Sequence, residues 1–203
     1  MIHIHTSPPT DDILPLASSH LWGWPDLPSH VALPHKYQTF IGQFNLADIA
    51  GSTPAVTSML PRGGLLSVFA DIEHFFCADI DGGVGMTYSD ACTVIYIPES
   101  ELGSLRRRHL RRYAPMCQAV TLDSRKCSLS EPDHQLLGFP SYREWDDWDP
   151  PYQGWQLLFQ LDSCDAYPEP LNFYDCGVLN LIIDPADLAR LDFSRVVAIV
   201  LST

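Results

Sequence analysis

Two glutamines and two aspartates are the residues whose types and positions could place polar chemistry inside this protein. Gln43 and Gln160 each lie in the middle of an apolar segment, and Asp162 and Asp175 follow the second of these segments. Amides and carboxylates that converge in a concave site could bind a small ligand or act as acid and base. A structural role is the alternative, because a buried amide must satisfy its hydrogen bonds, either on its own loop or against the other amide near a pseudo-two-fold axis.

Four aspartates recur where apolar segments end, at Asp71, Asp162, Asp175 and Asp184. Such a cluster could bind a metal ion or take part in acid–base catalysis. Helix caps and turns explain the same positions more simply, because Asp accepts hydrogen bonds from nearby backbone N–H groups. We therefore predict no catalytic residue among them.

An aromatic and acidic segment is the best candidate for a partner-binding surface. Tryptophan and tyrosine are frequent interface anchors, and interleaved carboxylates suit a basic partner. Alternatively, the segment folds over the core and buries its tryptophans. The candidate residues are Trp145, Asp146, Asp147, Trp148, Asp149 and Tyr152.

Motifs for known chemistry are missing from the sequence. It contains no Gly-x-Ser-x-Gly nucleophile elbow, no phosphate-binding Gly-x-x-x-x-Gly-Lys loop, no Cys-x-x-Cys pair and no His-Glu-x-x-His. His3 and His5 could share a metal ion on one strand face, but their spacing suggests no third ligand. We therefore predict a protein without catalytic residues, metal or cofactor, most of whose six cysteines are small buried hydrophobes.

The charge balance restricts the partners. The formal net charge of −13 over 203 residues disfavours nucleic-acid binding, which needs a cationic face, and favours a basic protein partner. The arginines between Arg106 and Arg112 could bind phosphate, RNA or an acidic protein, or could pair with carboxylates of this chain. No apolar run reaches the roughly 20 residues of a membrane helix, and the first residues do not resemble a secretory signal. These features predict a cytoplasmic protein without membrane contact.

An internal repeat must position these residues. Residues 37–97 and 155–203 each hold an apolar strand with a central Gln, then a loop and a Gly-led apolar strand that ends in Asp. The repeat predicts an α+β fold, with a predominantly antiparallel β-sheet, short helices and two pseudo-symmetric β-units that share one core. We expect one domain over residues 1–203.

Local patterns add more specific expectations. Residues 1–35 are predicted to be irregular apart from a strand at 2–5, and 75–80 to be a strand. Acidic residues early and arginines late in the segment Glu99–Tyr113 favour a helix. Asn45 is expected to cap a short helical turn, and Asp184 followed by Pro185 to open a second one.

Several ordered motifs resemble the YwqG-like family, also called the DUF1963 domain. The segment Ser19–Pro28 is similar to the family's S-K-x-G-G-x-P-x-L-P element, with His20 in place of Lys and Trp22 in place of the first Gly. Tyr174 replaces the Gly of its G-D-x-G element. Further matching segments are Phe40–Leu46, Leu60–Leu66, His134–Pro140, Leu158–Asp162, Tyr174–Gly177, Asp187–Leu188 and Asp192–Ser194.

The resemblance implies a cytoplasmic α+β domain without an established activity, which occurs among bacterial genes linked to toxin–immunity systems. It brings no catalytic residue with it. Our first hypothesis is therefore a non-enzymatic immunity protein that binds and neutralises a basic toxin domain. The alternatives are an enzyme or small-ligand binder with a pocket between the repeats, formed by Gln43, Gln160, Asp162 and Asp175, or a scaffold subunit.

Overall fold

A computed structural model describes most residues of this chain. These are residues 1–49, 58–76, 87–88, 90–109, 113–114, 116–124, 133–141, 148, 150–163, 170–173 and 176–202.

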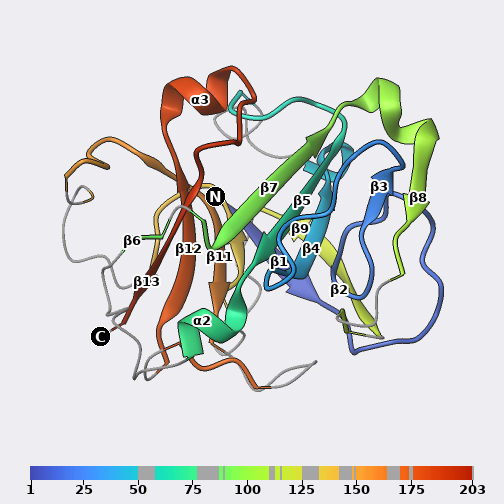
Figure 1. The fold of residues 1–203 in the computed structure, drawn as a ribbon, viewed down its shortest axis with the longest axis horizontal. Helices are drawn as coiled ribbons and strands as arrows, with labels where there is room; N and C mark the ends of the chain where they lie inside the picture. The colour runs from blue at the N-terminus through green and yellow to red at the C-terminus, as the bar shows by residue number, and fades with distance from the viewer. Residues whose placement is uncertain are drawn as a thin grey trace.

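Within this part of the chain, one antiparallel sheet of eleven strands dominates the fold (Figure 1). Its order is β6-β13-β12-β11-β10-β1-β9-β2-β4-β5-β7, and β3 pairs with β8 in a second, small sheet. The strands are β1 Ile2–Thr6, β2 His20–Trp22, β3 Asp26–Pro28, β4 Thr39–Asn45, β5 Leu65–Ala70, β6 Thr87–Tyr88, β7 Cys92–Ile97, β8 Leu105–Arg107, β9 Cys117–Asp123, β10 Gln135–Leu136, β11 Gln156–Asp162, β12 Val178–Ile183 and β13 Val197–Leu201. The predicted antiparallel sheet is confirmed.

The helices are short and lie at strand ends, as the sequence predicts. Figure 1 shows α2 and α3 at opposite ends of the molecule, each following a central strand. The backbone N–H of Ala47 bonds to the Asn45 side chain at 3.0 Å, and that of Ala186 to Asp184 at 2.7 Å, so both predicted caps are confirmed. The helices are η1 Leu46–Ile49, α2 Ile72–Phe76, η2 Glu99–Ser104 and α3 Pro185–Ala189.

Three local expectations are wrong. The expected helix over Glu99–Tyr113 is a short 3-10 helix followed by strand β8, because Leu105 is buried and residues 105–107 pair with β3, and residues 110–112 are outside the described part of the chain. Phe75 and Phe76 lie in α2, where Asp71 accepts a hydrogen bond from the N–H of His74 at 3.2 Å, and residues 77–80 are outside the described part of the chain. Strands β2 and β3 also occur inside residues 1–35, where the sequence suggests irregular chain.

The main hydrophobic core lies between the strands β4, β5, β7 and the strands β11, β12, β13. Phe44 and Phe159 are fully buried, and their ring centroids lie 5.7 Å apart across this core. Every residue of β5 and β12 is buried, because a second cluster around Phe69 covers the outer face of β5 and a third around Trp148 covers that of β12. These central strands are therefore apolar on both faces apart from Ser67 and Asn180, rather than alternating between apolar and polar residues.

Candidate functional site

Gln43 is fully buried and joins the residue Ser18 before β2 to Asp26 at the start of β3. Its Nε2 donates to the carbonyl of Ser18 at 3.0 Å and to Oδ2 of Asp26 at 2.8 Å. Its Oε1 accepts from the backbone N–H of Asp26 at 2.9 Å. The hydrogen bonds of the Gln43 amide are therefore made to the chain segments on either side of β2.

Gln160 makes corresponding contacts in the other half. Its Nε2 donates to the carbonyl of Asp133 at 2.8 Å and to Oγ of Ser141 at 3.1 Å. Its Oε1 accepts from the N–H of Ser141 at 2.8 Å and from Nε2 of Gln135 at 3.3 Å. Both glutamines thus hold a short strand and the loop that follows it, the structural role that we weighed against ligand binding.

We predict that Gln43→Leu and Gln160→Leu each lower the free energy of unfolding by about 2 kcal/mol. Leucine fills a similar volume but leaves the loop N–H and carbonyl groups without partners in the interior. Urea denaturation of each variant measures the loss. Gln153→Leu is the control, because Gln153 is exposed in a turn, and it should change stability by less than about 0.5 kcal/mol. Equal stability of wild type and both interior variants would contradict this role.

The other residues of the predicted inter-repeat pocket are also accounted for by local structure or lie outside the description. Asp162 accepts from the N–H of Asp133 at 3.0 Å, and its own N–H donates to Nδ1 of His134 at 3.0 Å. Asp175 lies outside the described residues. The two cavities discussed below are lined by neither glutamine and not by Asp162.

The aromatic and acidic segment is described only in part. Trp148 is buried, its Nε1 donates to the carbonyl of Trp155 at 2.9 Å, and it packs on Ile182 and Ile199. It therefore covers the core, and only Tyr152 of the described candidates is partly exposed. Four candidates, Trp145, Asp146, Asp147 and Asp149, lie outside the described residues.

The arginine-rich segment turns inward at Arg107. Its Nε donates to Oδ1 of Asp26 at 2.9 Å and its Nη2 to Oδ2 at 3.0 Å, and the Asp26 carboxylate is completely buried. Arg107 also donates to the carbonyl of Leu14 at 2.9 Å, which ties the N-terminal segment to β8. Pairing within the chain, one of our two alternatives for these arginines, thus holds for Arg107; Arg111 and Arg112 lie outside the described residues.

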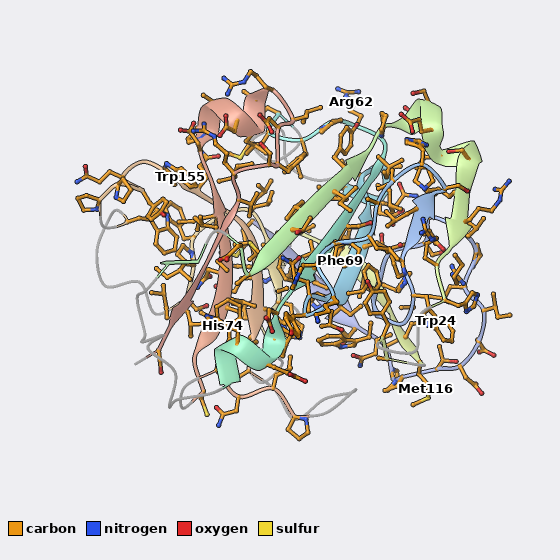
Figure 2. All side chains as sticks on the ribbon, viewed as in Figure 1. Trp24, Arg62, Phe69, His74, Met116 and Trp155 are labelled. Atoms are coloured by element: carbon orange, nitrogen blue, oxygen red, sulfur yellow. The ribbon has the colours of Figure 1, made fainter. Side chains whose placement is uncertain are left out.

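A cavity of about 410 Å³ opens beside this ion pair, between the N-terminal segment and the ends of β2 and β9. Gly23 has a φ of +78°, and a Cβ there would come within 2.9 Å of the Cβ of Cys117, so the wall needs glycine at this point. The cavity is lined by residues 10–16 and by His20, Gly23, Trp24, Arg107, His109 and Cys117. Figure 2 shows that Trp24 lies far along the long axis of the molecule from Trp155, so the cavity is separate from the contact between Trp148 and Trp155.

Two large apolar side chains that line this cavity are exposed. Ile13 exposes 89% of its surface and Leu16 50%. The indole of Trp24 lies 4.4 Å from the His109 ring, centroid to centroid. On the other side of residues 14–16, a shallower cavity of about 340 Å³ is lined partly by Ser19, Asn45 and Asp48.

Burial sets the protonation states in the cavity wall. It lowers the pKa of His20, although the carbonyl of Ser18 and the charge of Asp26 act in the opposite direction, so the imidazole is neutral at pH 7. Burial also raises the pKa of the Cys117 thiol, which keeps it protonated and weakly nucleophilic at that pH. The cavity wall therefore offers binding contacts rather than an activated nucleophile.

Sequence reasoning missed this cavity. Its signal was the apolar run Ile13-Leu14-Pro15-Leu16 directly after Asp11 and Asp12, within a segment expected to be irregular. An exposed apolar run next to charged residues is typical of a site that binds a protein or a ligand. The sequence could not show that this run lines the same cavity as His109 and Cys117, because that depends on long-range packing.

The family model for the domain of unknown function DUF1963 matches residues 19–130 and 110–200. The chain therefore belongs to the DUF1963 family, as its ordered motifs indicate. No curated protein matches it.

Two features are absent from the described residues: a helix that could cross a membrane and a cluster that could hold a metal ion. None of the helices there has the length and apolar content needed to cross a bilayer. Within the same residues, no group of three or more His, Cys, Asp or Glu side chains is arranged to hold a metal ion.

Proposed function

We propose that this chain is a non-enzymatic binding protein that captures a protein partner at the cavity beside β2 and β9. One observation carries the proposal: Ile13 and Leu16, exposed by 89% and 50%, stand at the mouth of a cavity lined largely by apolar side chains. Large apolar side chains around a concave site are typical of protein-binding surfaces, since covering them removes apolar area from water. This site replaces Trp148 at the centre of the expected interface.

The partner in this proposal is a basic domain, and an immunity role towards a bacterial toxin follows from it. The net charge of −13 supports attraction to a basic partner, and the exposed residues Asp11 and Asp12 line the cavity. Tight inhibition of a toxin needs a pre-formed surface rather than a reaction. The aromatic segment around Tyr152 would then form a second contact area.

We place this binding in the cytoplasm. Cys92, Cys117 and Cys176 are free thiols, which fits a reducing compartment. We also infer that the chain is an α+β domain built from two repeats of one β-unit. The matching contacts of Gln43 and Gln160 support this, as do the caps that Asp71 and Asp184 supply after β5 and β12.

Partner capture tests the proposal. The protein is used as bait in its own organism, and the affinity for the captured basic protein is then measured by isothermal titration calorimetry. We expect Ile13→Ser combined with Leu16→Ser to weaken binding by about tenfold or more, because apolar contact at the rim is lost. Both residues are exposed, so folding should be unaffected.

Phe139→Ser is the matched control. Phe139 is also an exposed apolar residue, at 74%, but it does not line the cavity. It should leave the affinity unchanged. Equal affinities for wild type and the Ile13/Leu16 variant would place the interface elsewhere and contradict the proposal.

A small-ligand binder is the second candidate, and the size of the cavity favours it. About 410 Å³ falls within the roughly 300–1,000 Å³ of typical ligand pockets. In that case a small molecule would raise the melting temperature of the isolated protein without any partner.

A further inference from the structure

We propose that the cavity beside β2 and β9 is a receptor for one long basic side chain, a lysine or an arginine, of the bound partner. The inference rests on the proposed function, since it names the group that enters the same cavity. It follows from the composition of the lining, which combines apolar side chains, an indole and two exposed carboxylates.

The walls suit an aliphatic stem. Ile13, Leu14, Pro15 and Trp24 all line the cavity. Lysine and arginine bury their methylene groups along such surfaces while the charged group stays near water. A tryptophan in the wall adds attraction, because a cation close to an indole face is held by the ring quadrupole.

The charges at the cavity favour a cation over an anion. Arg107 is the cationic member of the lining, but its guanidinium is already paired with the buried Asp26 carboxylate in two hydrogen bonds. Within the part of the chain that the structure describes, the carboxylates of Asp11 and Asp12 form no ion pair, and both residues line the cavity and are exposed. An anionic group would meet these two charges and would find the guanidinium occupied, whereas a cation gains from both carboxylates.

The segment that carries the carboxylates is held in place. The N–H of Asp12 donates to Oγ1 of Thr10 at 3.1 Å, and the backbone of Thr10 pairs with that of Cys117 through hydrogen bonds of 2.9 and 3.0 Å. Arg107 fixes the other end through the carbonyl of Leu14. The acidic rim is therefore positioned before binding, which lowers the entropic cost of ordering it.

The test uses the full chain and two small probes of similar shape. n-Butylguanidinium represents the arginine side chain, and n-butylurea is its neutral counterpart. Binding is followed by the indole N–H resonance of Trp24 in two-dimensional NMR, which a Trp24→Phe variant assigns. We expect n-butylguanidinium to shift this resonance with an affinity at least tenfold higher than that of n-butylurea. Replacing both Asp11 and Asp12 with Asn should remove about tenfold of that affinity.

A matched variant checks that the two rim carboxylates act locally. Replacing Asp48 with Asn removes an exposed carboxylate that lines the neighbouring cavity and not this one. It should leave the affinity for n-butylguanidinium unchanged. An equal loss in this variant would show a general effect of net charge and would overturn the inference.

The outcomes separate this inference from the proposed function. Equal binding of both probes, or no shift with either, overturns the basic side chain as occupant. Partner capture would still be decided by the Ile13/Leu16 variant, which does not change the charge of the rim. Loss of partner affinity in that variant together with equal probe binding would indicate a neutral apolar anchor in the cavity.

Discussion

Replacing Asp26 with Asn is expected to lower the free energy of unfolding by about 3–5 kcal/mol. The Asp26 carboxylate is completely buried and receives hydrogen bonds from Arg107, from Nε2 of Gln43 and from the N–H of Ala17. Asparagine removes the charge and turns one acceptor into a donor that faces these donors. The Arg107 side chain, only 14% exposed, then keeps an uncompensated charge in the interior, which costs far more than the pair itself contributes.

Urea denaturation at pH 7 measures this loss, and two further variants interpret it. Glu101→Gln breaks the exposed pair between Glu101 and His30 and should cost less than about 0.5 kcal/mol. Asp26→Leu combined with Arg107→Met removes both charges, and we expect it to be more stable than Asp26→Asn. A loss below about 1 kcal/mol for Asp26→Asn would mean that the pair does not hold the loops together.

The second large effect is a loss of stability in mild acid caused by His134. Burial lowers the pKa of this imidazole from 6.5 to about 4, against the opposing charge of Asp133. Its Nδ1 accepts the backbone N–H of Asp162, so protonation at that atom would break a buried hydrogen bond. The unfolded chain takes up the proton at pH 6.5, whereas the folded chain resists it down to about pH 4.

The contribution of His134 is therefore complete above pH 6.5 and is lost as the pH falls from 6.5 to about 4. A pKa shift of this size corresponds to about 3 kcal/mol in the free energy of unfolding. Because the carboxylates also titrate here, the measured quantity is the difference in unfolding free energy between wild type and His134→Asn. The Oδ1 of asparagine can replace Nδ1 as acceptor, so the variant keeps the hydrogen bond without the titration.

We expect this difference to change by about 3 kcal/mol in favour of the variant between pH 7 and pH 4. His134→Gln is the matched control, because its amide reaches the position of Nε2 and does not replace the acceptor. It should be less stable than His134→Asn at every pH but show the same pH-dependent change. A difference that stays constant between pH 4 and pH 7 would contradict the role of His134.

The sheet and its repeated elements could be predicted from local patterns. The runs at residues 65–70 and 178–183, apolar except for Ser67 and Asn180, indicate buried strands. Asn45 and Asp184 mark helix starts through their side-chain acceptors. The structural role of the two glutamines could also be predicted from the sequence, because a buried amide must form hydrogen bonds. Each of these inferences depends on interactions within a few residues or on a strand period.

The segment Glu99–Tyr113 shows where local reasoning stops. Its charges favour a helix, but the chain forms β8 instead, because Leu105 is buried and Arg107 pairs with Asp26, 81 residues earlier. The tryptophan loop is a second case. Trp148 suits an interface by residue type, yet it packs on Ile182 and Ile199 and covers a face of the sheet.

Sequence alone determined that this chain is an acidic, β-rich member of the DUF1963 family with paired Gln-centred strands, because composition, strand periodicity and ordered motifs are properties of the linear chain. Only the tertiary structure decided which polar groups form hydrogen bonds in the interior and which side chains surround a cavity. Trp24, His109 and Cys117 meet there because β2 pairs with β9 and β3 pairs with β8. Such pairings are long-range choices that minimise exposed apolar surface and unpaired backbone groups over the whole molecule, so no local pattern encodes them.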